Sequence, residues 1–275
     1  MLSVPADRQP SRRDRRRIAQ RPEPPDGGGA VPDNQLGELV ARLTDDSVGR
    51  SDRSRQLAAL TRALSGSARG AGVRAVAAGR WLADVVAEVA PRVPVRDQAT
   101  LRSHHPGRTD DEIAEALARG AMTATAALGA AAGALAAAEF AAPPTLLAAP
   151  VQLAAETVAI AAVEIKLVAE LHELYGEGVA GPLSQRGSQY LMSWVRQRAV
   201  EPATGGGVAA LLGAAAKREL RSRLMRRMGR STTSLAPFLA GAAAGAEVNR
   251  RGTRSLADKL VAELRGRQGR RWSDR

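Results

Sequence analysis

Cysteine is absent from this chain of 275 residues, and aromatic side chains make up only 3% of it. The lack of cysteine excludes disulfides, a thiolate nucleophile and cysteine-based zinc or iron–sulfur sites. Runs of valine, isoleucine and aromatic residues, which favour strands, are scarce, whereas alanine, the best helix former, is abundant. We therefore expect an all-α fold, an Ala/Gly-rich helical bundle with closely packed helices.

Lysine is nearly absent, so arginine carries most of the formal net charge of +12. Residues 1–120 contain 20 basic and 16 acidic side chains, residues 121–180 contain 1 and 6, and residues 181–275 contain 19 and 6. A GC-rich genome also enriches arginine and alanine, so the position of the charges is more informative than their number. The net positive charge belongs to the last third of the chain, which follows an acidic middle segment.

Composition divides the chain into four segments. The first combines arginine clusters with proline and glycine and contains no apolar run of signal-peptide length. The four are a disordered basic arm (1–34), amphipathic helices (35–108), the main helical domain (109–265) and a basic tail (266–275). Apolar residues at three- and four-residue spacing predict helices at 35–43, 52–64 and 73–89 within the second segment.

A long helical hairpin is expected at about 110–176. Its first helix begins at the capping box Thr109-Asp-Asp-Glu112, in which the threonine hydroxyl and the glutamate carboxylate satisfy each other's backbone N–H groups. It ends before Pro143-Pro144. The second helix has Pro150 as a kink or in its first turn, and Gly176 and Gly178 end it. Further helices are expected at 182–200, 208–228, 237–249 and 253–264.

Close helix packing is predicted where Gly-Ala-Ala-Ala-Gly-Ala occurs twice, because two glycines four apart let a neighbouring backbone approach. These glycines are Gly129, Gly133, Gly241 and Gly245. The longest uncharged stretch, Gly120–Ala138, has 19 residues and is borderline for spanning a bilayer. It consists largely of alanine, glycine and threonine, which favours buried helices of a water-soluble bundle over a membrane-inserted hairpin.

Polar residues of the second hairpin helix divide into two groups. Those on one face are interpreted as a solvated stripe. They are Gln152, Glu156, Lys166, Glu170 and Glu173. Glu164 and His172 lie nearer the apolar side, about 80° apart and about two turns from each other, which is too far for direct contact. We expect a polar seam made of Glu156, Glu164, His172 and Asn249, satisfied inside the bundle.

No catalytic signature accompanies these residues. The sequence contains neither a phosphate-binding loop nor a nucleophile elbow, and a three-histidine zinc site would need every histidine in the chain. The adjacent His104 and His105 are expected in a surface turn. We therefore expect no catalytic residue, no metal and no cofactor, and the sequence leans against an enzyme.

A basic amphipathic helix is predicted at 208–230. Apolar residues recur at every fourth position from Val208 to Met228, and one acid, Glu219, stands among seven cations. Such a helix suits an anionic bilayer surface or, through counterion release, nucleic acid; no aromatic residue is interleaved for base stacking. The cations expected to contact the anionic surface are Lys217, Arg218, Arg221, Arg223, Arg226, Arg227 and Arg230.

Residues 110–265 resemble the EcsC-like family of helical domains. The resemblance lies in the proline-broken stretch Phe140–Pro150, the helix ending in Leu174-Tyr175-Gly176, and the small-residue segment that leads to Asn249 and Thr253-Arg254. It implies an all-α, membrane-associated domain of bacterial origin without an established catalytic activity. An Asp common in the family is replaced here by Asn249. The structural markers it carries over are Gln152, Tyr175, Gly176, Gly241, Gly245, Asn249, Thr253 and Arg254.

The sequence thus predicts a non-enzymatic protein, attached peripherally to an anionic membrane surface through helix 208–230. Its expected location is the cytoplasm, at the inner face of the cell membrane. Two alternatives stay open: an integral membrane protein with an inserted hairpin at 110–176, and a nucleic-acid-binding protein that uses its Arg-rich C-terminal third.

Overall fold

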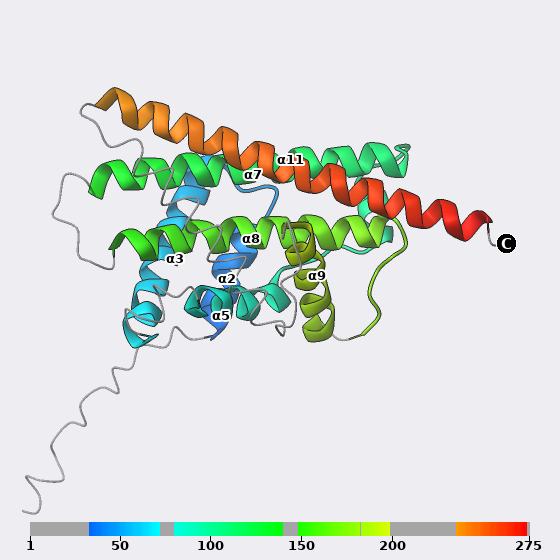
Figure 1. The fold of residues 1–275 in the computed structure, drawn as a ribbon, viewed down its shortest axis with the longest axis horizontal. Coiled ribbons are helices and arrows are strands. Elements are labelled where there is room, and N and C mark those ends of the chain that lie inside the picture. The colour runs from blue at the N-terminus through cyan, green and yellow to red at the C-terminus, as the bar shows by residue number, and fades with distance from the viewer. Residues whose placement is uncertain (1–32, 72–79, 140–147, 182, 199–234, 274–275) are drawn as a thin grey trace, which may run out of the picture.

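The computed structural model describes residues 33–71, 80–139, 148–181, 183–198 and 235–273, and all regular elements in these ranges are helices (Figure 1). The predicted all-α fold is therefore confirmed. The elements in chain order are α2 (Asp33–Leu43), α3 (Arg50–Ala71), α5 (Arg80–Val89), the 3-10 helix η1 (Ala90–Arg92), α6 (Gln98–Ser103), α7 (Asp110–Glu139), α8 (Ala148–Leu174), α9 (Leu183–Arg198) and α11 (Leu235–Ser273). Nearly all of the predicted basic arm and all of the predicted helix 208–230 lie outside the described residues.

The helical hairpin is formed by α7 and α8, which lie side by side. The capping box starts α7: the Thr109 backbone N–H donates to Glu112 Oε2 at 2.8 Å, and the Glu112 N–H donates to Thr109 Oγ1 at 3.3 Å. Pro150 lies in the first turn of α8, where its missing N–H is not needed. Gly176 ends α8 with a φ of 72°, and the following Glu177 N–H donates to the carbonyl of His172 at 2.8 Å.

α8 is the central helix of the described structure. It packs against α7, α3, α5, α9, α11, α6 and α2. From Val151 to Leu174 its side chains are buried except those of Glu156 and Glu173, which are half-buried. The interpretation of its polar residues as a solvated stripe is therefore wrong. A helix that is apolar around most of its circumference is surrounded by neighbours, and the few polar residues on it are then buried with the rest.

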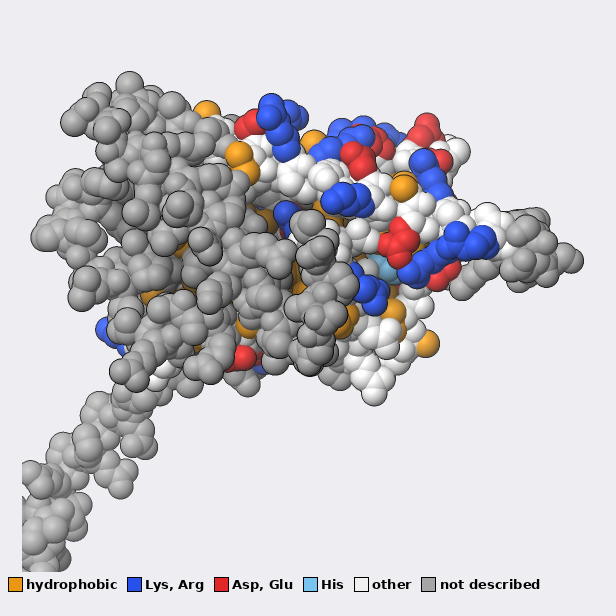
Figure 2. All heavy atoms as spheres, in the orientation of Figure 1, with side chains coloured by type: hydrophobic (Ala, Val, Ile, Leu, Met, Phe, Trp, Pro, Cys, Tyr) orange, Lys and Arg blue, Asp and Glu red, His pale blue; other side chains and the backbone are white. Residues whose placement is uncertain are grey.

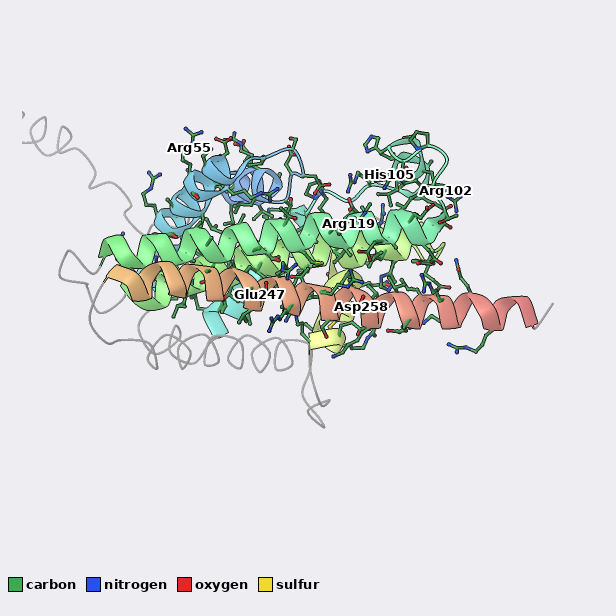
Figure 3. All side chains as sticks on the ribbon, turned by 90° about the horizontal axis from the view of Figure 1, so that it is seen from above. Arg55, Arg102, His105, Arg119, Glu247 and Asp258 are labelled. Atoms are coloured by element: carbon green, nitrogen blue, oxygen red, sulfur yellow. The ribbon has the colours of Figure 1, made fainter. Side chains whose placement is uncertain are left out.

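α11 corrects a second expectation, since residues 237–249 and 253–264 belong to one continuous helix of 39 residues. Gly252 between them lowers helix propensity without breaking the helix, because this part of α11 is supported by α7 along its length (Figures 1 and 3). The described helices, α11 included, share one hydrophobic core that extends from Leu36 in α2 to Leu264 in α11.

No helix in the described ranges combines the length and apolar character needed to cross a bilayer. Large apolar side chains are exposed at Val248 alone among the residues whose side chains are described. The described helices thus direct their apolar faces toward one another, and their outer faces are polar.

Candidate functional site

A buried carboxylate, Glu164, lies where α8, α9 and α11 meet, and its residue is only 1% exposed. Thr253 Oγ1 of α11 donates to its Oε1 at 2.9 Å, and Trp194 Nε1 of α9 donates to its Oε2 at 2.9 Å. Arg198, at the end of α9, pairs with both oxygens, with Nε 3.0 Å from Oε2. Thr253 also shares a 3.0 Å hydrogen bond with Thr125 of α7. We call these five residues the Glu164 cluster.

The Glu164 cluster extends toward Asn249, so three members of the predicted polar seam lie close together. The Asn249 amide donates to the Thr125 carbonyl and to Glu156 Oε1, both at 3.4 Å. His172 is the exception, because it contacts Val168 and Ser193 instead. The expectation that Glu164 and His172 make no direct contact agrees with these hydrogen bonds.

Two of the predicted packing glycines explain how α11 comes this close to α7. A Cβ atom on Gly129 would lie 2.4 Å from Asn249 Nδ2 and 3.0 Å from the Gly245 carbonyl oxygen. A Cβ on Gly245 would lie 3.5 Å from the Gly129 carbonyl oxygen. The helices therefore cross at these two glycines. Gly133 and Gly241 lie on the same two helices, but their contacts are outside what the structure describes.

A second buried ion pair joins α8 to the loop between η1 and α6. Arg96 donates from two nitrogens to the two oxygens of Glu170, each at 2.7 Å, and the carboxylate of Glu170 is almost fully buried. Hydrogen bonds to Glu170 raise the pKa of Arg96, against the effect of its partial burial. Lys166 on the same helix donates to the Thr44 carbonyl at 2.8 Å and lies 3.3 Å from Asp46.

The last two turns of α8 carry another set of polar contacts. Glu173 accepts hydrogen bonds from Arg186 at 2.5 Å and from the Tyr190 hydroxyl at 2.6 Å, both on α9. Tyr175 donates to Asp111 Oδ1 at 2.8 Å, and Arg265 of α11 pairs with the same carboxylate. The hydrogen bond from Tyr175 and the nearby Arg265 lower the pKa of Asp111, against the effect of burial.

Two carboxylates of α8 are fully engaged with protein donors. Both oxygens of Glu164 and both of Glu170 accept hydrogen bonds from side chains outside α8. Within the described ranges, no group of three or more ligating side chains is arranged to hold a metal ion. The arrangement neutralises charge and joins helices.

Two further residues, Gln152 and Arg254, connect α7 with its neighbours outside the Glu164 cluster. Gln152 is 2% exposed and its amide lies 3.5 Å from the Ala132 carbonyl, which links the two arms of the hairpin. Arg254 pairs with Glu115 of α7 at 2.8 Å and with Asp258 on its own helix. His104 is exposed in the turn after α6, and His105 beside it is half-buried. Figure 3 shows His105 near Arg102, which lies in the last turn of α6.

Sequence reasoning did not identify three partners of the buried acids, Trp194, Arg198 and Arg96, nor Thr125, which pairs with Thr253. These residues lie 30 or more positions from their partners, and a single sequence carries no signal of such long-range pairs. The imbalance of charge, with six acids and one lysine in residues 121–180, was the one available indication that arginines from elsewhere neutralise this segment.

Comparisons of the chain with protein-family models, with curated proteins and with solved structures find no match. The seven cations predicted to contact an anionic surface lie outside the described residues.

Proposed function

We propose that the chain is a non-enzymatic helical-bundle protein that attaches peripherally to an anionic membrane surface through the basic segment 208–230. One observation carries the proposal: the positive charge is concentrated outside the described bundle. The described ranges contain 24 Lys and Arg against 21 Asp and Glu. Residues 208–230 contain seven cations and one acid.

Many arginines of the described bundle are engaged with carboxylates, which supports this division of charge. On α11, Glu247 pairs with Arg250 and Arg251, and Glu263 pairs with Arg267. Figure 2 shows the same mixture, with basic and acidic side chains next to each other over the described part of this face. A surface of alternating charge attracts an anionic bilayer weakly, whereas a segment with a net charge of +6 attracts it strongly.

We also propose that the bundle is a distant EcsC-like domain, located at the inner face of the cell membrane. The markers of that resemblance support it, because Gln152, Asn249 and Thr253 are buried polar residues at contacts between helices. Residues in such positions keep a helical arrangement in register without taking part in chemistry.

The test is co-sedimentation of the purified full chain with vesicles of phosphatidylcholine, with and without phosphatidylglycerol. We expect binding to the anionic vesicles only, and weaker binding as salt is raised. Changing Arg221, Arg226 and Arg227 to Glu removes three cations, each of which contributes about 1 kcal/mol near the surface, so the affinity falls about a hundredfold or more.

The matched control changes three exposed arginines of the bundle, Arg62, Arg108 and Arg119, to Glu. It alters the net charge by the same amount, and we expect a much smaller effect on binding. A wild-type chain that ignores anionic vesicles at low salt contradicts the proposal. Binding to DNA that falls steeply with salt would support the nucleic-acid alternative, and resistance of the cellular protein to carbonate extraction would support the inserted hairpin.

A further inference from the structure

α9 is attached to α8 by ionisable or polar side chains on successive turns. These contacts lie along the face of α9 that meets α8 and α11, and all three α8 residues that accept them can take up a proton. From the first turn to the last, they are Arg186 and Tyr190 to Glu173, Ser193 to His172, and Trp194 and Arg198 to Glu164. Docking of this helix therefore depends on the protonation of α8 side chains.

His172 is the imidazole among these three acceptors, and histidine is the side chain type whose ordinary pKa lies closest to neutral pH. Its Nδ1 lies 2.7 Å from the Val168 carbonyl oxygen. A carbonyl oxygen only accepts hydrogen bonds, so Nδ1 carries the proton and the unprotonated Nε2 faces Ser193 Oγ at 3.5 Å. The Tyr190 ring covers the imidazole with its centroid 5.7 Å away.

The charged groups that face His172 come from α11 and from the turn that follows α8. Arg267 and Glu263 belong to α11, and Glu177 belongs to the turn. Burial lowers the pKa of His172 below its ordinary 6.5, and Arg267 acts in the same direction. The hydrogen bond to Val168 and the two carboxylates oppose the shift without cancelling it.

We propose that His172 is an acid-responsive joint, whose protonation loosens α9 from α8 and α11. The imidazolium would place a full charge in a seam where its direct contacts, Tyr190 and Ser193, are uncharged, and where burial outweighs the attraction of Glu263 and Glu177. The unfolded or undocked chain, whose histidine is solvated, binds that proton more readily. Docking of α9 is therefore at full strength above about pH 6.5 and weakens as the pH falls from there through the lower pKa of the docked state.

The consequence for the membrane rests on the proposed function. α9 ends at Arg198, and nine residues, 199–207, separate it in the sequence from the basic segment 208–230. The potential of an anionic bilayer, about −30 mV or more negative, concentrates protons and lowers the pH at its surface by roughly half a unit. Approach to such a surface favours the protonated His172, so attachment and loosening of α9 support each other.

The experiment measures the full chain in solution, without vesicles, by hydrogen exchange and by NMR titration of its three histidines. Between about pH 7.5 and about pH 5.5 we expect α9 to lose protection relative to α7, after correction for intrinsic exchange, by up to about tenfold, which is the most that one pH unit below the ordinary histidine pKa allows. His172→Gln removes this dependence. His104→Gln, which changes an exposed imidazole, keeps it.

Either of two results overturns the proposal: protection of α9 that does not change with pH in the wild type, or an imidazole of His172 that titrates at or above 6.5. The second needs no variant, so it decides the matter even where His172→Gln fails to fold. Vesicle binding is a separate measurement. If the chain shows the acid response but binds no anionic vesicle, the proposed function is refuted and the proposal for His172 stands.

Discussion

α8 and α11 are both long helices rich in charged residues, and they use those residues in opposite ways. On α8, Glu164, Glu170 and Glu173 are paired with arginines that belong to other elements. On α11, Glu247 and Glu263 are paired with arginines three or four positions away on the same helix. The α8 acids are 1% to 14% exposed at their side chains, whereas those α11 acids are 35% to 38% exposed.

This difference in exposure decides how much an ion pair between a carboxylate and an arginine contributes to stability. A pair on the surface exchanges contacts with water for contacts with another charge, and the net gain is close to zero. A buried pair gains little overall either, because burial of both charges is costly, but removal of one partner leaves the other without water or a counter-charge. The acids of α8 thus fix which helices dock and where, while Glu247 and Glu263 of α11 neutralise arginines of their own helix on its outer face.

The largest expected effect comes from Glu164→Ala. The change leaves the N–H of Trp194 and the hydroxyl of Thr253 without their acceptor and leaves Arg198 without its counter-ion. Loss of one partner of a buried pair costs roughly 3–5 kcal/mol, and we expect the lower end because the Arg198 side chain is 27% exposed and reaches water. Urea denaturation, followed by circular dichroism, measures the change in the free energy of unfolding.

The matched control is Arg251→Gln on α11, which breaks a pair with Glu247 at a side chain that is 79% exposed. We expect its urea midpoint to equal that of the wild type within the scatter of the measurement. Equal destabilisation by the two variants would show that the contrast between α8 and α11 is wrong.

A smaller effect is expected from Gly129→Ala, where α7 and α11 cross. The new Cβ would overlap Asn249 Nδ2 and press on the backbone of Gly245, so the helices must separate, at a cost of about 1–3 kcal/mol. Gly120→Ala, on the same helix, meets nothing within 4 Å, and alanine improves helix propensity there by up to about 1 kcal/mol. Thermal unfolding of both variants checks the prediction, which fails if they shift in the same direction.

Local signals in the sequence identified much of the fold. The capping box at Thr109, the positive φ at Gly176 and the long hairpin follow from patterns within a few residues, and the structure contains all three. The close approach at Gly129 and Gly245 was also predicted, because two glycines four apart mark a helix face on which a backbone can come near.

Predictions that depend on the environment of a helix were less successful. The face of α8 with Gln152, Lys166 and Glu170 has the spacing of a solvated stripe, and only the helices packed around it show that it is buried. The donors to Glu164 come from α9 and α11, 30 to 89 positions away. Periodicity describes one helix at a time, so it placed Glu164 near the apolar side of its helix but did not identify the arginine and the hydroxyl that accompany it.

The smallest expected effect concerns the two tyrosines, which connect the end of α8 to α7 and to α9. Tyr175 donates to Asp111 and Tyr190 donates to Glu173. Burial and these hydrogen bonds raise the pKa of Tyr175 to about 12 and also raise that of Tyr190. The unfolded chain ionises its tyrosines near pH 10, so their contribution to stability is present below pH 10 and is lost as the pH rises toward 12.

The ultraviolet absorbance of tyrosinate measures this directly, because the chain has only 2 tyrosines. We expect little tyrosinate near pH 10 in the native protein and normal titration near pH 10 in urea. Tyr175→Phe halves the number of titrating groups and raises the pKa of Asp111 toward its ordinary value, since the largest cause of its lowering is removed. Native tyrosines that titrate near pH 10 would mean that the end of α8 is open to water, and that its polar contacts resemble those on the surface of α11 rather than those around Glu164.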